Sequence, residues 1–154
     1  MCLTAHRNNI KLMEKLIKIV DTSIDVAFLE NWTADPTCGA VVSFLGKVRN
    51  KNHGKEVLEL EYTTYTAMAL KQLDEIVGEV NKKWSIKKTA LVHRCGNLKI
   101  GDMAVAIFIA SEHRHDAFEA CEFLIDELKK RVPIWKKETY QNGTTWIGQQ
   151  CTHN

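Results

Sequence analysis

The most informative stretch of this sequence reads Leu128-Lys129-Lys130-Arg131-Val132-Pro133-Ile134-Trp135-Lys136-Lys137-Glu138. Residues with helical spacing run into Lys129, and Pro133 ends that pattern because proline cannot continue a helix and disfavours helical backbone at Val132. The chain then continues as a short extended segment. A sharp corner is therefore flanked by five cations, namely Lys129, Lys130, Arg131, Lys136 and Lys137.

Two explanations of this corner stay open from the residues alone. Clustered cations suit a small anionic substrate, or place an ammonium group for acid/base chemistry. A solvated helix end would carry the same residues, because Lys and Arg favour the negative pole of the helix dipole and are common there. The corner is a candidate site that needs support from the rest of the chain.

The composition is that of one ordinary globular domain. The 154 residues suffice for one hydrophobic core, and 45% hydrophobic with 26% charged residues is typical of soluble proteins. The 21 Lys and Arg residues against 19 Asp and Glu leave a net charge of +2. That balance does not indicate nucleic-acid binding. Any recognition of an anion is therefore expected to be local.

The cysteines and the apolar runs favour a cytoplasmic protein. The five cysteines are odd in number and have no C-x-x-C spacing, so neither a disulfide framework nor a zinc site is indicated. Cys95 and Cys121 lie in apolar patterns and are expected in the core. No apolar run approaches the roughly 18 residues that span a bilayer. The start, Met1 to Asn9, lacks the apolar core of a signal peptide.

The N-terminal part of the chain contains one expected helix between two expected strands. Residues 1–16 are mostly polar and are expected to form a variable extension. A first strand would begin at about Ile17. Ser23 is the candidate N-cap of a short helix over 24–31, whose apolar residues would face inward. The run 40–45 is apolar enough to be a strand covered on both faces.

The middle of the chain alternates loops with regular elements. Residues 46–55 form a polar, basic segment that we expect to be a loop, and 96–98 a connection. The apolar residues of 66–83 repeat at helical spacing and predict a long amphipathic helix. Strands are expected at 58–62, 89–92 and 103–110, the last of which is nearly all apolar and should be central.

The C-terminal part predicts a helix followed by a hairpin. Asp116, with Glu119 three residues later, resembles a capping box at the start of a helix. The buried stripe of that helix would be Ala117, Cys121, Leu124, Ile125 and Leu128. After the corner, residues 135–140 and 144–147 flank Asn142-Gly143, a strong hairpin signal, and Trp135 is expected in the core. The whole is an α+β or mixed α/β domain of about three helices and six or seven strands.

Three basic loops could carry chemistry, because loops on a rigid scaffold are where binding and catalysis concentrate. They are 46–50, 111–114 and 129–138. Each has an ordinary explanation as well, as a solvated hairpin loop, a helix entry or a helix end. If they converge, they surround one pocket with Lys47, Arg49, His113, Arg114, Lys129 and Lys136. Arginine forks and lysine point charges together suit a phosphate.

Five segments, in order, resemble the large, catalytic subunit of molybdopterin synthase. They are 39–50, 60–62, 92–102, 111–118 and 128–138. One such motif would be weak, whereas five in the family's order are specific. The resemblance covers residues 17–148 and leaves 149–154 as a C-terminal tail. It implies an α/β hammerhead-like domain with an added α+β portion, which agrees with the element count.

The resemblance implies a sulfurtransferase of molybdenum cofactor biosynthesis. Such an enzyme transfers two sulfurs to cyclic pyranopterin monophosphate (precursor Z) and forms the dithiolene of molybdopterin. The sulfur would arrive as a thiocarboxylate on the C-terminal Gly-Gly tail of a small ubiquitin-like sulfur-carrier subunit. Two large subunits would dimerise with a small subunit at each end, giving a heterotetramer. No cofactor, metal ion, nucleic acid or membrane is expected.

The resemblance also implies roles for residues at matching positions. Lys129 and Lys136 match the two catalytic lysines. The expected substrate-binding residues are Lys47, Val48, Arg49, His113, Arg114, Lys129, Lys136, Lys137 and Glu138. Our hypothesis makes Lys136 the general acid/base, and gives Lys129 the task of neutralising the thiocarboxylate or a developing oxyanion.

Other functions use the same residues. A non-catalytic module could hold phosphate or RNA on these cations, with Trp135 and Tyr140 as stacking surfaces. An inactive paralogue kept as a scaffold would have no need of the full set of cations. A persulfide sulfurtransferase would need a reactive thiolate, whereas here Cys38, Cys95 and Cys151 are expected to be replaceable.

Overall fold

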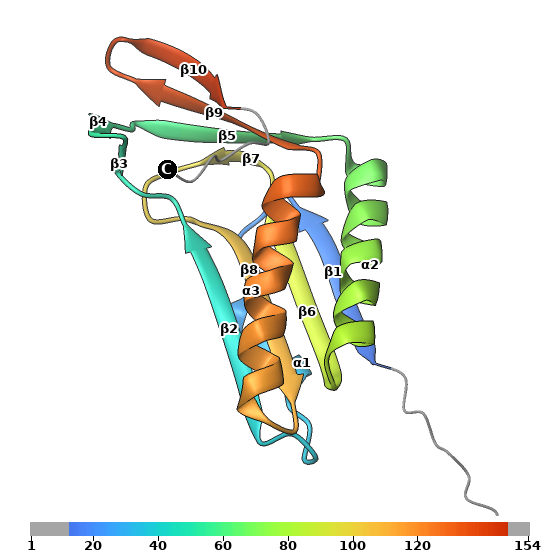
Figure 1. The fold of residues 1–154 in the computed structure, drawn as a ribbon. Coiled ribbons are helices and arrows are strands. Elements are labelled where there is room, and N and C mark those ends of the chain that lie inside the picture. Colours follow the sequence, from blue (N-terminus) through green and yellow to red (C-terminus); the bar gives the residue numbers. More distant parts are fainter. Residues whose placement is uncertain (1–12, 148–154) are drawn as a thin grey trace, which may run out of the picture.

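The computed structural model describes residues 13–147 of the chain. In that range it contains three helices and ten strands, arranged as two four-stranded sheets and a two-stranded hairpin (Figure 1). The α+β class and the three helices are confirmed. The expected extension lies largely outside the described residues, as do the expected tail 149–154, Cys2 and Cys151.

The strands outnumber the six or seven predicted. The difference comes from three very short strands in segments predicted as a loop and a connection: β3 (Lys51–Asn52), β4 (Lys55–Glu56) and β7 (Gly96–Leu98). Strands of two or three residues are too short to leave a periodic pattern in the sequence. The β3–β4 turn is His53-Gly54, whose positive φ values of 48° and 78° are those that a type I′ hairpin turn requires.

The first sheet forms the body of the domain. Its strand order is β1 (Glu14–Val20), β6 (Ile86–Arg94), β8 (Met103–Ser111) and β2 (Ala40–Lys47). β1 and β6 are parallel, and the other neighbours are antiparallel. β8 lies inside the sheet and is buried after Met103, as its apolar run predicted. β1 begins at Glu14 rather than near Ile17.

Helices cover the two faces of this sheet unequally. α2 (Thr66–Lys83) and α3 (Arg114–Arg131) lie side by side on one face, and the shorter α1 (Val26–Thr33) lies on the other (Figure 1). The main core fills the space between α2, α3 and the sheet. α2 has the predicted bounds. The predicted stripe of α3 is buried in this core: Ala117, Cys121, Leu124, Ile125 and Leu128.

Three predictions near the faces of this sheet were wrong. α1 is capped by Asp25, whose Oδ1 accepts a hydrogen bond from the Phe28 N–H at 3.0 Å, so Ser23 is not the cap. Phe28 is 48% exposed and does not face inward. β2 is an edge strand covered on one face only, because Val41 and Leu45 are exposed on the other.

The start of α3 also differs from the prediction. The helix begins at Arg114, and His113 occupies the N-cap position without a capping side-chain bond. Asp116 lies in the first turn, where its Oδ2 accepts a hydrogen bond from the Ser85 N–H at 3.1 Å. Glu119 accepts one from the Trp84 indole N–H at 2.8 Å. Both carboxylates therefore bind the end of α2 rather than form a capping box.

The second sheet lies across the end of the first sheet at which α3 ends (Figure 1). Its order is β10 (Gly143–Ile147), β9 (Ile134–Tyr140), β5 (Glu59–Thr64) and β7. The corner at Pro133 is confirmed, because α3 ends at Arg131 and β9 begins three residues later, at Ile134. The β9–β10 hairpin is also confirmed, with Gln141-Asn142 as its loop and Gly143 at φ 128° opening β10.

Alternation along β9 divides its side chains between two faces. Ile134, Lys136 and Glu138 face a cavity between the two sheets. Trp135 and Lys137 lie on the outer face. Trp135 is 39% exposed there, so its predicted place in the core was wrong.

Candidate active site

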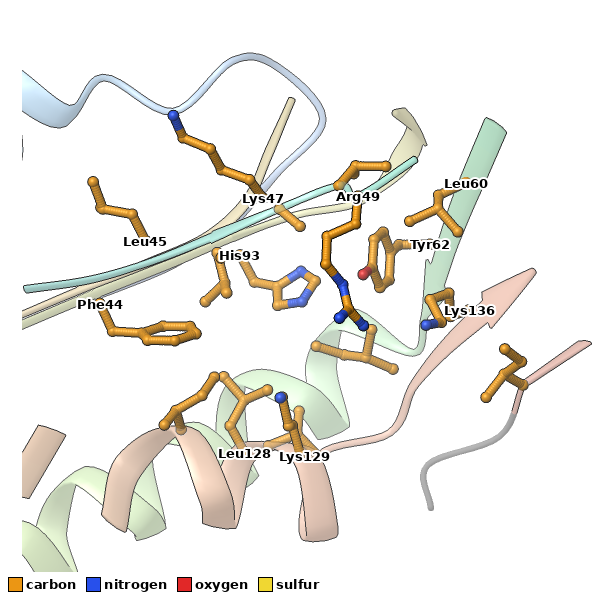
Figure 2. A pocket seen from close by; sticks show the side chains of 18 of the residues that line it. Phe44, Leu45, Lys47, Arg49, Leu60, Tyr62, His93, Leu128, Lys129 and Lys136 are labelled. Atoms are coloured by element: carbon orange, nitrogen blue, oxygen red, sulfur yellow. The ribbon is translucent and has the colours of Figure 1, made fainter. Parts of the chain in front are cut away.

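A cavity of about 640 Å³ opens where the second sheet meets the end of β2 and the last turns of α3. Its walls come from β2 and the segment after it, from β5, β6 and β8, from α3, and from β9 and β10, so residues far apart in sequence meet there (Figure 2). The apolar lining includes Phe44, Leu45, Val57, Leu60, Val105, Ile125, Leu128, Val132 and Ile134. A volume of this size matches that of a typical small-molecule site.

Four cations line the cavity. Lys47 ends β2, Arg49 follows it, Lys129 lies in the last turn of α3, and Lys136 lies on β9. Figure 2 shows the charged ends of Arg49, Lys129 and Lys136 pointing into a common space, whereas the ammonium of Lys47 points away from them. The corner at Pro133 places Lys129 and Lys136 on adjoining walls. The first and third predicted loops therefore converge.

Val48 holds the first loop in place between its two cationic neighbours. Its side chain is buried in the small core under the second sheet. Its N–H donates to the Asp102 carbonyl at 2.9 Å, and its own carbonyl accepts from the Gly101 N–H at 2.8 Å. The backbone on both sides of Val48 is thus fixed, which fixes where Lys47 and Arg49 emerge.

The predicted site residues of the second loop lie far from the cavity in the fold. His113 and Arg114 are exposed at the N-terminal end of α3. Arg114 and Lys129 are fifteen positions apart on one helix, which corresponds to about 22 Å at 1.5 Å per residue. One copy of the chain therefore does not bring His113 and Arg114 to the cavity.

Lys137 also lies outside the cavity. Its Nζ is 3.4 Å from Glu61 Oε2 and 5.4 Å from the centre of the Trp146 ring, on the outer face of the second sheet. Of the predicted site residues, those that line the cavity are Lys47, Val48, Arg49, Lys129, Lys136 and Glu138.

A buried carboxylate network surrounds Lys136. Its Nζ lies 2.7 Å from Glu138 Oε1, and the Glu138 side chain is 2% exposed. Asn52 Nδ2 donates to both Glu138 oxygens at 2.9 Å, and the Tyr140 hydroxyl donates to Oε2. Burial pushes the pKa of Glu138 up, but the hydrogen bonds from Asn52, Lys136 and Tyr140 outweigh it and leave that pKa below its usual value.

His93 is a cavity residue that the sequence reasoning missed. It lies on β6, is 4% exposed, and its ring meets the Tyr62 ring edge-on with 5.3 Å between centroids. His93 Nδ1 lies 2.9 Å from the Arg94 carbonyl, which can only accept, so Nδ1 carries the proton. Burial lowers the pKa of His93 to about 4. A histidine inside an apolar strand was the signal that could have found it.

The thiols of Cys95 and Cys121 are poor nucleophiles. Burial raises the pKa of Cys95 and of Cys121 to about 11, so both are protonated at neutral pH. Cys121 is buried, as predicted, whereas Cys95 is only partly so. In the described part of the chain, no cysteine lines the cavity, and no three His, Cys, Asp or Glu residues are grouped to hold a metal ion.

The fold and this site define a member of a known family. The family model described as "MoaE protein" matches residues 19–131, and the chain belongs to that family. Molybdopterin synthase catalytic subunit of Staphylococcus carnosus is 44% identical to it, over 88% of this chain and 91% of that protein. The resemblance found in the sequence is thereby confirmed. No helix among residues 13–147 is long and apolar enough to cross a membrane.

Solved structures agree with this assignment. The crystal structure of molybdopterin synthase from Staphylococcus aureus superimposes with a TM-score of 0.80 at 43% identity, covering 84% of this chain and 95% of that one. A complex of subunits 1 and 2 of the molybdopterin-converting factor from Helicobacter pylori has a TM-score of 0.70 at 21% identity, covering 90% and 92%. The second likeness concerns the fold alone.

Proposed function

We propose that this chain is the catalytic subunit of a molybdopterin synthase and that the cavity is where sulfur is transferred to cyclic pyranopterin monophosphate. The observation that carries the proposal is the convergence of Arg49, Lys129 and Lys136 on one cavity with a largely apolar lining. The apolar walls suit the pterin rings, and Arg49 suits the cyclic phosphate because a guanidinium binds phosphate through paired donors.

The two lysines differ in their surroundings, which supports different roles. The Lys136 ammonium is held 2.7 Å from the buried Glu138 carboxylate, and a fixed ammonium suits a proton donor. Lys129 has no acidic partner in the part of the chain that the structure describes. Its charge is therefore available to the thiocarboxylate or to an oxyanion.

Each sulfur transfer forms one C–S bond and breaks one C–O bond of the substrate. The thiocarboxylate sulfur forms a C–S bond to a substrate carbon, and the C–O bond of that carbon breaks as Lys136 donates a proton to the departing oxygen. Water hydrolyses the acyl–sulfur bond, which returns the tail as a carboxylate and restores the proton to Lys136. No thiol of this chain takes part, in keeping with the raised pKa of Cys95 and Cys121.

A second copy of the chain would supply His113 and Arg114. Both residues lie at the end of α3 opposite to Lys129, and α3 packs on the sheet beside β2. β2 is an edge strand with exposed Val41 and Leu45, and such an edge is suited to pairing with another chain. Antiparallel pairing of two β2 strands about a two-fold axis would bring the N-terminal end of each α3 toward the other copy's cavity.

The remaining parts of the proposal concern the partner and the compartment. A small sulfur-carrier subunit would dock at the cavity and insert its C-terminal tail, giving a heterotetramer with the dimer. The named subunits of the Helicobacter pylori complex support this partnership. A cytosolic location is supported by the free thiols of Cys95 and Cys121. The alternative of an RNA-binding module loses support because Trp135 and Tyr140 lie on opposite faces of β9.

Reconstitution tests the proposed function. The purified chain is mixed with a thiocarboxylated small subunit and cyclic pyranopterin monophosphate, and molybdopterin is measured as its oxidised fluorescent derivative. We expect Lys136→Ala to lower turnover by about 10²–10⁴-fold, the usual effect of removing a general acid, while the tail still binds. Lys129→Ala should weaken tail binding as well as turnover.

The matched control is Lys130→Ala, in the same turn of α3. Lys130 is exposed and pairs with Glu127 at 3.2 Å, so its removal should change neither activity nor binding. Wild-type protein that binds the tail but makes no product would point to a scaffold. If Lys136→Ala and Lys129→Ala both affect binding alone, the acid/base role of Lys136 is wrong.

A further inference from the structure

The carboxylate of Glu138 already has a full set of partners inside the chain. A carboxylate offers about four acceptor positions, two on each oxygen. Oε1 accepts from Lys136 Nζ at 2.7 Å and from Asn52 Nδ2 at 2.9 Å. Oε2 accepts from the same Asn52 nitrogen at 2.9 Å and from the Tyr140 hydroxyl. With 2% of its side chain exposed, Glu138 has no acceptor position left for another donor.

We propose that Glu138 is a positioning residue that fixes Lys136 and makes no contact with the substrate, and that Asn52 and Tyr140 hold Glu138 in place. This inference rests on the proposed function, because it assigns how one wall of that same cavity works. A bound phosphate would also be repelled by this carboxylate, so a role as substrate ligand conflicts with its charge as well as its burial.

The β3–β4 hairpin supplies one of the two residues that hold Glu138 in place, namely Asn52. Asn52 reaches Glu138 from β3, and Lys55 Nζ on β4 lies 5.9 Å from the centre of the Tyr140 ring. The hairpin is anchored by the buried Val57, whose N–H donates to the Asn50 carbonyl at 2.9 Å. It therefore braces the face of β9 that carries Glu138 and Tyr140, and through them the ammonium of Lys136.

The orientation of Glu138 depends on the two donors other than Lys136, which are Asn52 and Tyr140. Asn52 contacts both oxygens and Tyr140 contacts the one remote from Lys136, which leaves Oε1 directed at the ammonium. Without these donors the carboxylate is free to rotate about its side-chain torsions, and Lys136 would follow it. Displacement of a reacting group by about 1 Å costs on the order of 100-fold in rate.

The test compares Asn52→Ala, Tyr140→Phe and Glu138→Gln in the reconstituted synthase. Binding of cyclic pyranopterin monophosphate is measured by calorimetry, and kcat is measured over pH 6–10. We expect all three variants to bind the substrate within about 2-fold of wild type, while kcat falls by about 10–100-fold.

Two further measurements separate positioning from general damage. Asn52→Ala should cost nothing more once Glu138→Gln is present, because the carboxylate through which Asn52 acts on Lys136 has been removed. Glu56→Gln, an exposed change on the same hairpin, should leave kcat unchanged. Thermal unfolding confirms that each variant is folded before it is assayed.

The possible results lead to different conclusions. Substrate binding at least 10-fold weaker in Glu138→Gln, with kcat preserved, would overturn the inference and make Glu138 a substrate ligand. Additive effects of Asn52→Ala and Glu138→Gln on kcat would overturn the role of Asn52. Wild-type protein that makes no molybdopterin would instead refute the proposed function, so the two failures are distinguishable.

Discussion

His93 illustrates how one buried side chain couples this fold to pH. Burial lowers its pKa to about 4 from 6.5, so the folded chain keeps the ring neutral over a range in which the unfolded chain protonates it. The unfolded state binds the extra proton between those two values. Stability from this group is therefore complete above pH 6.5 and is lost as the pH falls toward 4.

We predict that His93→Gln removes this part of the pH dependence. The wild-type free energy of unfolding should drop by up to about 3 kcal/mol between pH 7 and pH 4, because the unfolded chain takes up this proton near pH 6.5 and the folded chain only near pH 4. Urea unfolding at several pH values measures the slope in both proteins. An equal slope in the variant would mean that other groups cause the acid sensitivity.

Gly39 is a residue at which no side chain fits. A Cβ there would lie 2.8 Å from the backbone carbonyl oxygen of Glu112, in the loop that leads into α3. We predict that Gly39→Ala lowers the free energy of unfolding by about 1–3 kcal/mol, the usual cost of overpacking. Urea denaturation of the wild type and the variant measures this difference in the free energy of unfolding.

The control for this prediction is Gly78→Ala. Gly78 lies in α2, where an added Cβ meets nothing within 4 Å. Alanine is the better helix former, so this change should stabilise the protein by up to about 1 kcal/mol. If Gly39→Ala and Gly78→Ala changed the free energy of unfolding equally and in the same direction, the close contact at Gly39 would not be the cause of the change.

Among the elements, α1 offers a test of its observed cap. We predict that Asp25→Ala lowers the free energy of unfolding by about 1 kcal/mol, because the Phe28 N–H loses its acceptor. Asp25→Asn should cost little, since asparagine caps equally well. Ser23→Ala, at the position expected from sequence, should be neutral. A loss at Ser23 rather than at Asp25, measured by chemical denaturation, would contradict the observed cap.

Helices whose residues carry a long local pattern were predicted well, whereas features that depend on tertiary contacts were missed. α2 and the body of α3 were predicted because a repeat of apolar residues over five turns leaves a strong pattern. The caps of α1 and α3 were missed because several nearby residues can cap, and tertiary contacts choose among them. Asp116 binds Ser85 instead of its own helix.

Strand faces were harder to predict than strand positions. The apolar run at 40–45 was read as covered on both sides, but the strand lies at the sheet edge with Val41 exposed. Trp135 was placed in the core because of its neighbours, although alternation puts it opposite Ile134. Apolar residues held for an outside partner have the same sequence pattern as core residues.

At the scale of the whole molecule, the sequence indicated the cations but not their setting. Lys47, Arg49, Lys129 and Lys136 could be nominated from loops and from the family resemblance, and they share a cavity. The contact between Asn52 and Glu138 joins residues 86 positions apart, and nothing local predicts it. Nor could the sequence show that one chain keeps His113 and Arg114 away from the cavity.

The proposed dimer predicts a specific pattern of complementation. Lys136→Ala and Arg114→Ala should each inactivate the homodimer, because each removes one half of every site. In a mixed dimer, one site would have both defects and the other neither. Random exchange of equal amounts should therefore restore about a quarter of wild-type activity in the reconstitution assay, given two-fold symmetry.

Two controls complete that experiment. Each variant must bind its small subunit and form dimers alone, as measured by analytical ultracentrifugation. Mixing Lys136→Ala with Lys129→Ala should restore nothing, because both lysines come from the same chain's cavity. If mixing Lys136→Ala with Arg114→Ala also restored no activity, Arg114 would not act in the active site of the other copy.

The length of α3 has a consequence for how this protein can change over time. Under the proposed pairing, α3 sets the distance between the two active sites of the dimer, because Arg114 serves one site and Lys129 the other. One inserted residue would turn one end against the other by about 100° and lengthen the rod by about 1.5 Å. Surface loops tolerate insertions and deletions during evolution, whereas the number of residues in α3 is expected to stay the same in every chain that remains active.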